Sequence, residues 1–310
     1  MGKLVLMFPG QGSQAVGMGS DLCAADPLMR ETMAEASDVL GYDLEVLCAA
    51  GPADRLGRTD ITQPALLAVS IGIYRMLRRD GLRYAVAMGH SLGEYSALAA
   101  TGAVDYADAL RLVMRRGQEM LRAAEASRGG MSAIFGLDDS AVEALCAELD
   151  GVWPANFNSP GQVVVSGRSD ALDQLAEKAV QAGARKVIRL AVGGAFHSPL
   201  VQPAVGPLKA ELVSTAWRAP DPAFFSVSSV AFESAGFSEL LQRQLVSPVC
   251  FTQSVRALYA AGYDSFLEVG PGAVLAGLVK RIAPEASVAR VGDAETLAAL
   301  RADGHYLEDA

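Results

Sequence analysis

The feature that most constrains this chain is a serine held between two glycines, where an apolar run meets a helical pattern. The run YAVAMG (84–89) predicts a buried strand, and LGEYSALAA (92–100) predicts a helix directly after it. Gly89 and Gly93 are the small residues that let a strand and a helix pack closely across such a sharp turn. The junction therefore predicts an α/β fold with Ser91 at the start of a helix.

Two interpretations of Ser91 are open. A serine at a helix start can simply cap the helix, its oxygen accepting a backbone N–H. Alternatively its hydroxyl is a nucleophile, because the free N–H groups and the dipole of the helix favour negative charge on a reacting oxygen. The strand before the turn and the helix after it favour the nucleophile.

A serine nucleophile needs a base within hydrogen-bond reach, and the chain has three histidines. His90 precedes Ser91 on a tight turn, where neighbouring side chains point apart, so we expect a structural role for it. His305 lies in the polar tail DGHYLEDA. His197 lies in GGAFHSPL, a pattern typical of a loop at a sheet edge, and it is the predicted base.

An arginine lies on the apolar face of a predicted helix at 106–124, for which Asp105 is the expected cap. Arg116 follows the helical spacing of the apolar residues Ala109, Leu112, Val113 and Met120. A buried guanidinium without a partner is costly, so Arg116 should meet an anion in a bidentate pairing. Three partners are open: a substrate carboxylate, an internal Asp or Glu, or solvent reached beside Gly117. The arginines on another stripe of the helix, expected to be solvated, are Arg111, Arg115 and Arg122.

The order of strands and helices predicts two domains. Apolar runs at 4–10, 84–89, 223–230 and 264–270 alternate with helical patterns, which indicates a parallel sheet covered on both faces. Between them, residues 131–192 follow the β-α-β-β-α-β order of a ferredoxin-like unit. We expect a small domain at 128–192 inserted into a large domain formed by 1–127 and 193–310.

Composition excludes some classes of function. The chain of 310 residues has a net charge of −9, which argues against a nucleic-acid binder. Its apolar segments are too short to span a membrane, and no basic leader precedes the first strand, so we expect a cytoplasmic protein. The four cysteines are far apart and predict neither a disulfide framework nor a metal site: Cys23, Cys48, Cys146 and Cys250.

Several blocks of the chain, in order, resemble the malonyl-CoA:acyl carrier protein transacylase family. The resemblance covers almost the whole length and includes these blocks: MFPGQGSQAVGMG (7–19), TQPAL (62–66), GHSLGEYSAL (89–98), RRGQEM (115–120), NFNSPGQVVVSG (156–167), AFHSPL (195–200), RQLVSPVCF (243–251) and EVGPGAVLAGLVKRI (268–282). It implies an α/β-hydrolase-like large domain with a ferredoxin-like insertion. It also implies ping-pong transfer of a malonyl group from malonyl-CoA to an acyl carrier protein of fatty-acid or polyketide synthesis.

The resemblance assigns roles by matching position. Ser91 would carry the malonyl ester, His197 would act as base and then acid, and Gln11 with the N–H of Leu92 would form the oxyanion hole. Arg116 would hold the malonyl carboxylate, with further substrate contacts from Gln63, Asn158 and Phe196. The ring of Phe196 would crowd a substituent on the malonyl α-carbon. We expect a monomer that needs no metal and no cofactor, since the coenzyme A thioester is a substrate.

The histidine's second nitrogen has no acidic partner in the sequence. In the family a backbone carbonyl of the PVxW segment orients the ring, and here that segment reads PVCF, so Cys250 is the expected acceptor. A carbonyl role tolerates this departure because every residue has that acceptor.

Two other classes of function are consistent with parts of this pattern. An esterase of the α/β-hydrolase type would share the elbow and the histidine, but it gives no reason for Arg116 to face inward and the chain lacks an HGGG-type segment. The second class is a subunit that docks the carrier protein without turnover, or a transferase subunit of the malonate-decarboxylase type. An acidic carrier needs a local basic patch, and the candidates are Arg185, Lys186 and Arg189, or Lys280 and Arg281.

Overall fold

Two sheets organise the chain in this computed structural model, which describes residues 3–304 and 306. His305 lies outside the described residues. The large sheet has the order β10-β9-β1-β2-β7-β8 and the small sheet the order β4-β5-β3-β6. The strands of the large sheet are β1 (Leu4–Phe8), β2 (Val86–Gly89), β7 (Ala223–Ser226), β8 (Ala231–Glu233), β9 (Ser265–Val269) and β10 (Ser287–Val291). Those of the small sheet are β3 (Gly129–Phe135), β4 (Val152–Ser159), β5 (Gln162–Arg168) and β6 (Lys186–Arg189).

The large sheet is parallel except for its edge strand β8, which pairs antiparallel with β7. Side chains of β1 alternate between its two faces: Leu4, Leu6 and Phe8 join one core, and Val5 and Met7 join another. Both faces are therefore buried, as the apolar runs predicted.

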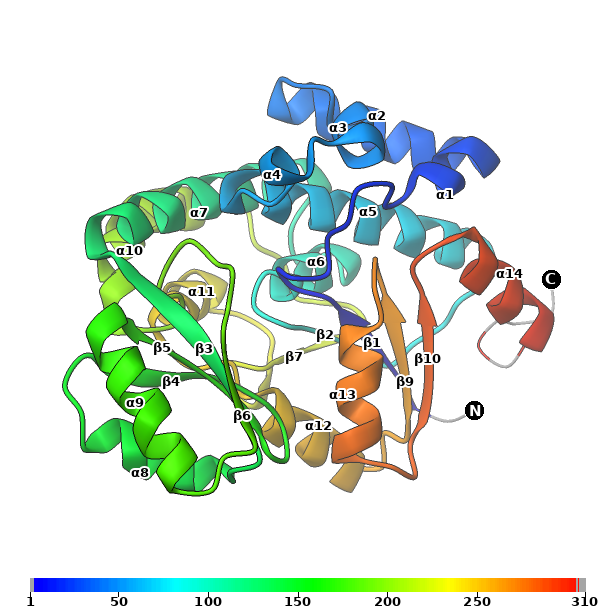
Figure 1. Cartoon of the computed structure of the whole chain (residues 1–310). Coiled ribbons are helices and arrows are strands. Elements are labelled where there is room, and N and C mark those ends of the chain that lie inside the picture. The colour runs from blue at the N-terminus through cyan, green and yellow to red at the C-terminus, as the bar shows by residue number, and fades with distance from the viewer. Residues whose placement is uncertain (1–2, 305, 307–310) are drawn as a thin grey trace.

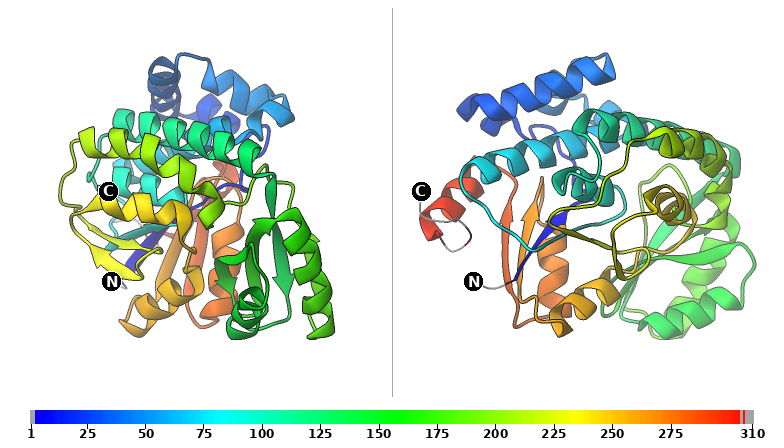
Figure 2. Two further views of the ribbon diagram at one scale, coloured as in Figure 1. Left: turned by 90° about the vertical axis from the view of Figure 1, so that its left-hand side faces the viewer. Right: turned by 180° about the vertical axis from the view of Figure 1, so that it is seen from behind.

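Helices cover both faces of this sheet (Figures 1 and 2). The larger core includes residues of α2 (Pro27–Leu40), α5 (Thr59–Arg79), α6 (Gly93–Ala100), α7 (Tyr106–Ser127) and α11 (Phe237–Val246). The core on the other face includes residues of α12 (Phe251–Ala260) and α13 (Val274–Ile282). The remaining helices of the large part are α1 (Ser20–Ala25), α3 (Leu44–Ala50), α4 (Ala53–Leu56), α10 (Val205–Ser214), α14 (Ala294–Asp303) and the 3₁₀ turn η1 (Pro199–Ala204).

The small sheet is antiparallel, and its strand order is that of the ferredoxin-like fold. Its helices α8 (Asp139–Ala147) and α9 (Ser169–Gln181) pack on the face that carries Ile134 and Val163. The opposite face carries Met131 and Val164, which belong to the larger core of the molecule. The small sheet thus lies between its own helices and the large part (Figure 1). This sheet and its two helices fall within 128–192, but the division into two domains stays a prediction.

Two local predictions were wrong. The strand expected at 223–230 ends at Ser226, because the Ser226 hydroxyl accepts the backbone N–H groups of Ser228 and Ser229 and closes a turn. Asp105 occupies the N-cap position of α7 without capping it, because its carboxylate pairs with Arg218 instead.

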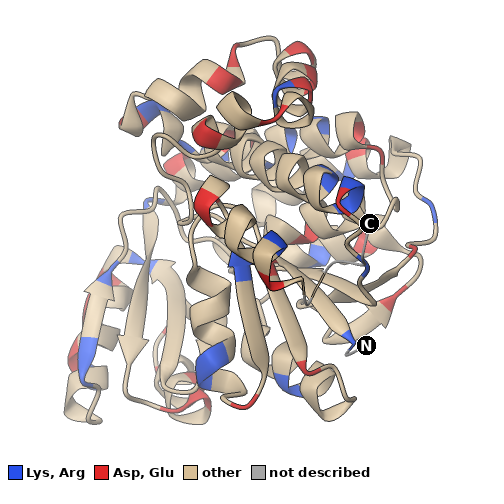
Figure 3. Cartoon of the chain, turned by 90° about the vertical axis from the view of Figure 1, so that its right-hand side faces the viewer, with Lys and Arg blue, Asp and Glu red and all other residues tan. Residues whose placement is uncertain are grey.

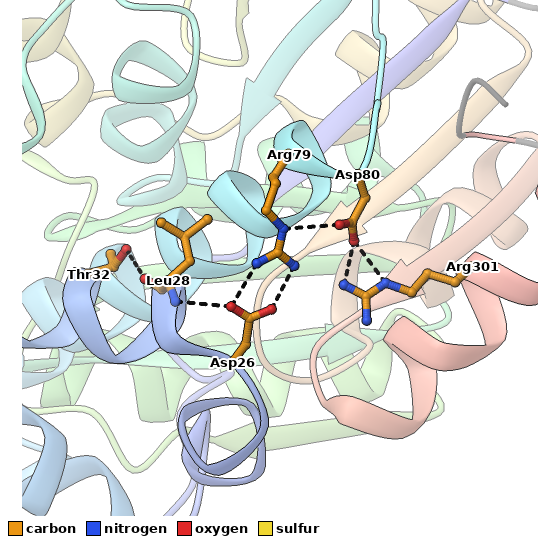
Figure 4. A network of polar contacts seen from close by, with 6 residues as sticks. All are labelled: Asp26, Leu28, Thr32, Arg79, Asp80 and Arg301. Atoms are coloured by element: carbon orange, nitrogen blue, oxygen red, sulfur yellow. Dashed lines mark hydrogen bonds and ion pairs between the residues drawn. The ribbon is translucent and has the colours of Figure 1, made fainter. Parts of the chain in front are cut away.

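Charged residues lie mainly on the outer helices and loops, while the strands are mostly uncharged (Figure 3). One charged network joins three helices (Figure 4). Arg79 at the end of α5 donates to both oxygens of Asp26, the N-cap of α2, at 2.8 and 2.6 Å. Asp80 accepts from Arg301 on α14, so the chain's last described helix is fastened to α5.

The four cysteines are free thiols. Burial raises the pKa of Cys23 to about 11 and that of Cys48 and Cys146 to about 12, so these thiols are unreactive near neutral pH. No described helix has both the length and the apolar character needed to cross a membrane.

Candidate active site

The turn from β2 to α6 is as tight as the sequence predicted. A Cβ on Gly89 would lie 1.9 Å from the backbone carbon of Gly93, and one on Gly93 would lie 2.0 Å from the backbone oxygen of Phe8. Neither position accepts a side chain. Ser91 has φ 53°, a left-handed conformation that a non-glycine residue adopts only under strain. This strained conformation places the Ser91 hydroxyl at the N-terminal end of α6.

Ser91 and His197 are in hydrogen-bond contact, with 2.7 Å between Oγ and Nε2. His197 also has a left-handed backbone, at φ 57°, and only 4% of it is exposed. Its Nδ1 lies 2.9 Å from the backbone oxygen of Gln244. A carbonyl can only accept, so Nδ1 carries the proton and Nε2 is free to accept the proton of Ser91.

The assignment of the orienting carbonyl to Cys250 was wrong. The Cys250 oxygen accepts from the N–H and the hydroxyl of Ser254 at the start of α12. Gln244 lies in the last turn of α11, where carbonyls have no acceptor role left within the helix. The physical signal was therefore a helix end six residues earlier, which the family resemblance at PVCF did not reveal.

Burial, and then the positive charge of Arg116, lower the pKa of His197 to about 3, against an ordinary value of 6.5. The hydrogen bond to Gln244 acts in the opposite direction but does not offset them. The imidazole is consequently neutral at physiological pH. A neutral imidazole beside a serine hydroxyl is the form that a general base requires.

Arg116 is buried, as helical phase predicted, and is 1% exposed. Its Nη1 donates to Gln63 Oε1 at 2.9 Å, and its Nη2 donates to Gln244 Oε1 and to Ser91 Oγ, both at 3.0 Å. The guanidinium carbon also lies 5.6 Å from the ring centre of Tyr95. Among the described residues no carboxylate forms an ion pair with Arg116. Neutral amides hold its guanidinium, so its positive charge stays available to a bound anion.

Gln244 and Glu94 belong to this site, although the sequence argument assigned neither. The Gln244 side chain lies between Arg116 and Glu94, donating through Nε2 to a Glu94 oxygen and, at 2.9 Å, to the backbone oxygen of Ser91. Glu94 is fully buried in the first turn of α6. Its place three residues after the nucleophile, inside GHSLGE, was the only available signal.

A cavity of about 90 Å³ adjoins these groups. It is lined by Gln11, His90, Ser91, Leu92, Arg116, Met120, Met131, Asn156, Leu190, Val192, Phe196 and His197. Within the described part of the chain, the backbone N–H groups of Gln11 and Leu92 donate to no acceptor. Two free N–H groups beside a serine hydroxyl are the donors that an oxyanion hole needs.

Two residues expected to contact substrate lie outside this cavity lining. Gln63 is buried on α5 behind the guanidinium and donates through Nε2 to the Met120 sulfur at 3.4 Å. Asn158 Oδ1 lies 3.0 Å from His90 Nε2, so Asn158 supports the elbow from β4. Asn156, two residues earlier on β4, lines the cavity in its place. Phe196 does line it, as expected.

Relatives share this chain's full extent. Malonyl CoA-acyl carrier protein transacylase of Escherichia coli (strain K12) is 43% identical over 305 residues, covering 96% of this chain and 99% of that protein. The protein of the same name from Bacillus subtilis (strain 168) is 40% identical over 303 residues, covering 96% of each chain.

Solved structures agree in fold. An acyl carrier protein S-malonyltransferase from Vibrio cholerae superposes with a TM-score of 0.93 at 43% identity, covering 96% of this chain and 99% of that one. A malonyl-transacylase solved in complex with a type II PKS acyl-carrier protein gives a TM-score of 0.94 at 40% identity, covering 97% and 99%.

The sequence model described as the acyl transferase domain matches residues 5–308, nearly the whole chain. With the paired Ser91 and His197 and relatives above 40% identity over 96% of its length, the chain belongs to the acyl transferase domain family.

Proposed function

We propose that this protein transfers a malonyl group from malonyl-CoA to the phosphopantetheine thiol of an acyl carrier protein, by way of a malonyl ester on Ser91. The observation that carries the proposal is Arg116: a buried guanidinium that forms no ion pair with any described carboxylate and donates to the Ser91 hydroxyl at 3.0 Å. A buried cation in this position would be stabilised by the carboxylate of a malonyl group bound next to Ser91.

In the first half-reaction, His197 Nε2 takes the proton of Ser91 while Oγ attacks the thioester carbonyl. The oxygen of the tetrahedral intermediate takes the negative charge and lies toward the free N–H groups of Gln11 and Leu92. The carbon–sulfur bond then breaks, and the proton on His197 passes to the departing coenzyme A sulfur. Ser91 is left as the malonyl ester.

The second half-reaction runs the same steps with the carrier thiol. His197 takes the thiol proton, the sulfur attacks the ester carbonyl, and the same two N–H groups meet the developing charge. When the ester bond breaks, the proton returns from His197 to Ser91 Oγ. The net reaction exchanges one thioester for another, so no oxidant, metal or cofactor enters the balance.

Arg116 has three N–H groups that no glutamine holds. Gln63 accepts one N–H of Nη1 and Gln244 accepts one of Nη2. This leaves the N–H of Nε, which has no partner among the described residues, the second N–H of Nη1, and the N–H that Nη2 directs at Ser91. Two donors on adjacent nitrogens match the two oxygens of a carboxylate. The cavity of about 90 Å³ is small, which suits a short acyl group.

The basic patch that we favour for the carrier is the one at Arg185, Lys186 and Arg189. It lies on and just before β6, and the chain continues from there into Leu190 and Val192, which line the cavity. Lys186 is exposed, so a carrier bound at β6 would have its prosthetic arm beside the entrance. Lys186→Glu should slow transfer to the carrier and leave acylation by malonyl-CoA unchanged.

We further propose that the protein works as a monomer in the cytoplasm. The free cysteines fit a reducing compartment. Light scattering on the purified protein tests the oligomeric state.

Labelled malonyl-CoA tests the function directly. Label should remain on Ser91 in the absence of a carrier and move to the carrier thiol when holo carrier protein is added. Release of free malonate with no label on the carrier would instead indicate a hydrolase. The absence of any label on the protein would remove the proposal.

A further inference from the structure

Glu94 is a buried carboxylate that the transfer chemistry above does not use. One oxygen accepts from the Ser226 hydroxyl at 2.6 Å and from the N–H of Val227 at 2.8 Å, and the other accepts from the Ser228 hydroxyl at 3.2 Å and from Gln244 Nε2. The Ser226 oxygen already accepts two backbone N–H groups, so its single proton points to Glu94. Every contact of Glu94 is thus a bond that it accepts, as an ionised carboxylate does.

This carboxylate determines which way the Gln244 amide faces. Both N–H groups of Gln244 have acceptors, one being Glu94 and the other the Ser91 carbonyl, so Oε1 faces the guanidinium of Arg116. Rotating the amide by half a turn would set its N–H groups against those of Arg116 and its oxygen against Glu94. Both new contacts are unfavourable, so the amide has a single orientation.

The arrangement separates the two buried charges by one neutral amide. A carboxylate in direct contact with Arg116 would occupy the N–H groups of its guanidinium and compete with a substrate carboxylate. One amide further away, Glu94 still compensates the buried cation, since the cost of burying charge falls when opposite charge lies nearby. The guanidinium therefore keeps its direction toward Ser91 without losing its free N–H groups.

We propose that Glu94 is a positioning residue for malonyl selection: through the Gln244 amide it holds Arg116 in line with the Ser91 hydroxyl. The inference rests on the proposed function, because it concerns the recognition of the malonyl carboxylate. It assigns to Glu94 no contact with substrate.

The test is Glu94→Gln, with acylation of Ser91 measured separately from malonyl-CoA and from acetyl-CoA, which has no carboxylate. The new amide places an N–H group where a Glu94 oxygen accepted from Gln244. The Gln244 amide therefore turns, and Arg116 loses the acceptor that Gln244 provides. Losing a hydrogen bond to a charged group is worth about 10- to 100-fold, so kcat/KM for malonyl-CoA should fall by that factor. With acetyl-CoA the fall should stay within about threefold, so the ratio of the two substrates should collapse.

Glu268→Gln is the matched control. Glu268 is also fully buried, but it accepts the backbone N–H groups of Leu275 and Ala276 at the start of α13 and does not contact Arg116. This variant should lower the melting temperature and leave the malonyl-to-acetyl ratio as in the parent. Equal losses for both substrates in Glu94→Gln would mean that Glu94 acts only on stability and would overturn the inference.

Gln244→Met provides a second route if Glu94→Gln folds poorly. Methionine keeps the backbone carbonyl for His197 and removes the amide, so the ratio should fall as in Glu94→Gln. The double variant should select malonyl no worse than Gln244→Met alone, because Glu94 acts through that amide. Additive losses would overturn the inference. Failure of the proposed function would appear separately, as a parent protein that does not take up malonyl at all.

Discussion

Two strand-to-helix junctions lie near each other at the carboxyl edge of the large sheet, and each buries a glutamate. At the first, β2 turns into α6 and Glu94 binds side chains that lead to Arg116 and Ser91. At the second, β9 turns into α13 and Glu268 binds the N–H groups of that helix. Burial raises the pKa of both carboxyls. The same residue type thus orients a reactive site at one junction and caps a helix at the other.

The two junctions are both crowded, but by different atoms. A Cβ on Gly93 at the start of α6 would lie 2.0 Å from the backbone oxygen of Phe8, and a Cβ on Gly270 after β9 would lie 2.5 Å from the Ser70 hydroxyl oxygen. The first junction differs in placing a non-glycine residue, Ser91, at positive φ, whereas Gly270 takes that conformation at the second. Within α13 itself there is room, since a Cβ on Gly277 would meet nothing within 4 Å. The following changes test this comparison.

The largest effect is expected for Ser91→Ala. Without the hydroxyl there is no acyl-enzyme, so transfer should fall by at least about 10⁴-fold. The intact mass of the protein after exposure to malonyl-CoA should show no added acyl group. Ser96→Ala removes a hydroxyl that is buried within α6, and this variant should still be acylated. An acylated Ser91→Ala protein would place the nucleophile elsewhere.

Gly93→Ala should disrupt folding far more than Gly277→Ala within α13. Its Cβ would lie 2.0 Å from the Phe8 oxygen, and this backbone atom cannot move without displacing β1. We expect the free energy of unfolding to fall by roughly 4 kcal/mol or more, as for severe steric changes. Urea unfolding measures it, and a loss below about 1 kcal/mol would contradict the compressed junction.

Arg116→Ala should remove about 2–5 kcal/mol of transition-state stabilisation for malonyl transfer. Acetyl transfer should suffer less, because acetyl has no carboxylate to bind. The exposed Arg122→Ala on the same helix is the control and should leave both rates unchanged. A preference for malonyl as strong as in the parent would show that the Arg116 guanidinium does not bind the malonyl carboxylate.

Arg116→Ala should also change the pH dependence. The charge of Arg116 lowers the pKa of His197, so its removal should raise that pKa. The base must be neutral, and protonation below its pKa stops it. The rate of acylation by acetyl-CoA should therefore begin to fall at a higher pH in the variant than in the parent, whose His197 pKa is about 3. Superimposable pH profiles would mean that the charge of Arg116 does not affect the pKa of His197.

The smallest effect is expected for Gly277→Ala, where a Cβ has room. Gly277 is exposed in the middle of α13, and alanine there should stabilise the protein by about 0.5–1 kcal/mol. Malonyl transfer should not change. Urea unfolding checks the gain, and destabilisation would mean that α13 is packed as tightly as α6.

Much of the site followed from local patterns. Ser91 was predicted from its glycines, Arg116 from helical spacing, and His197 by elimination among the histidines. Gln244 was out of reach for the same reasoning, because its two roles combine a carbonyl exposed by a helix end with an amide held by residues up to 153 positions away. The resemblance of the PVCF segment to its family placed the carbonyl at Cys250, since the end of α11 was not located.

The sequence by itself determined the strand order of the ferredoxin-like insertion, the parallel character of the large sheet and the turn that presents Ser91, because these depend on periodicity and on small residues at fixed spacing. The tertiary structure alone decided that neutral amides hold Arg116 and that Glu94 lies one amide behind it. Buried polar groups must be satisfied by whatever the fold brings near them, and those neighbours come from distant parts of the chain.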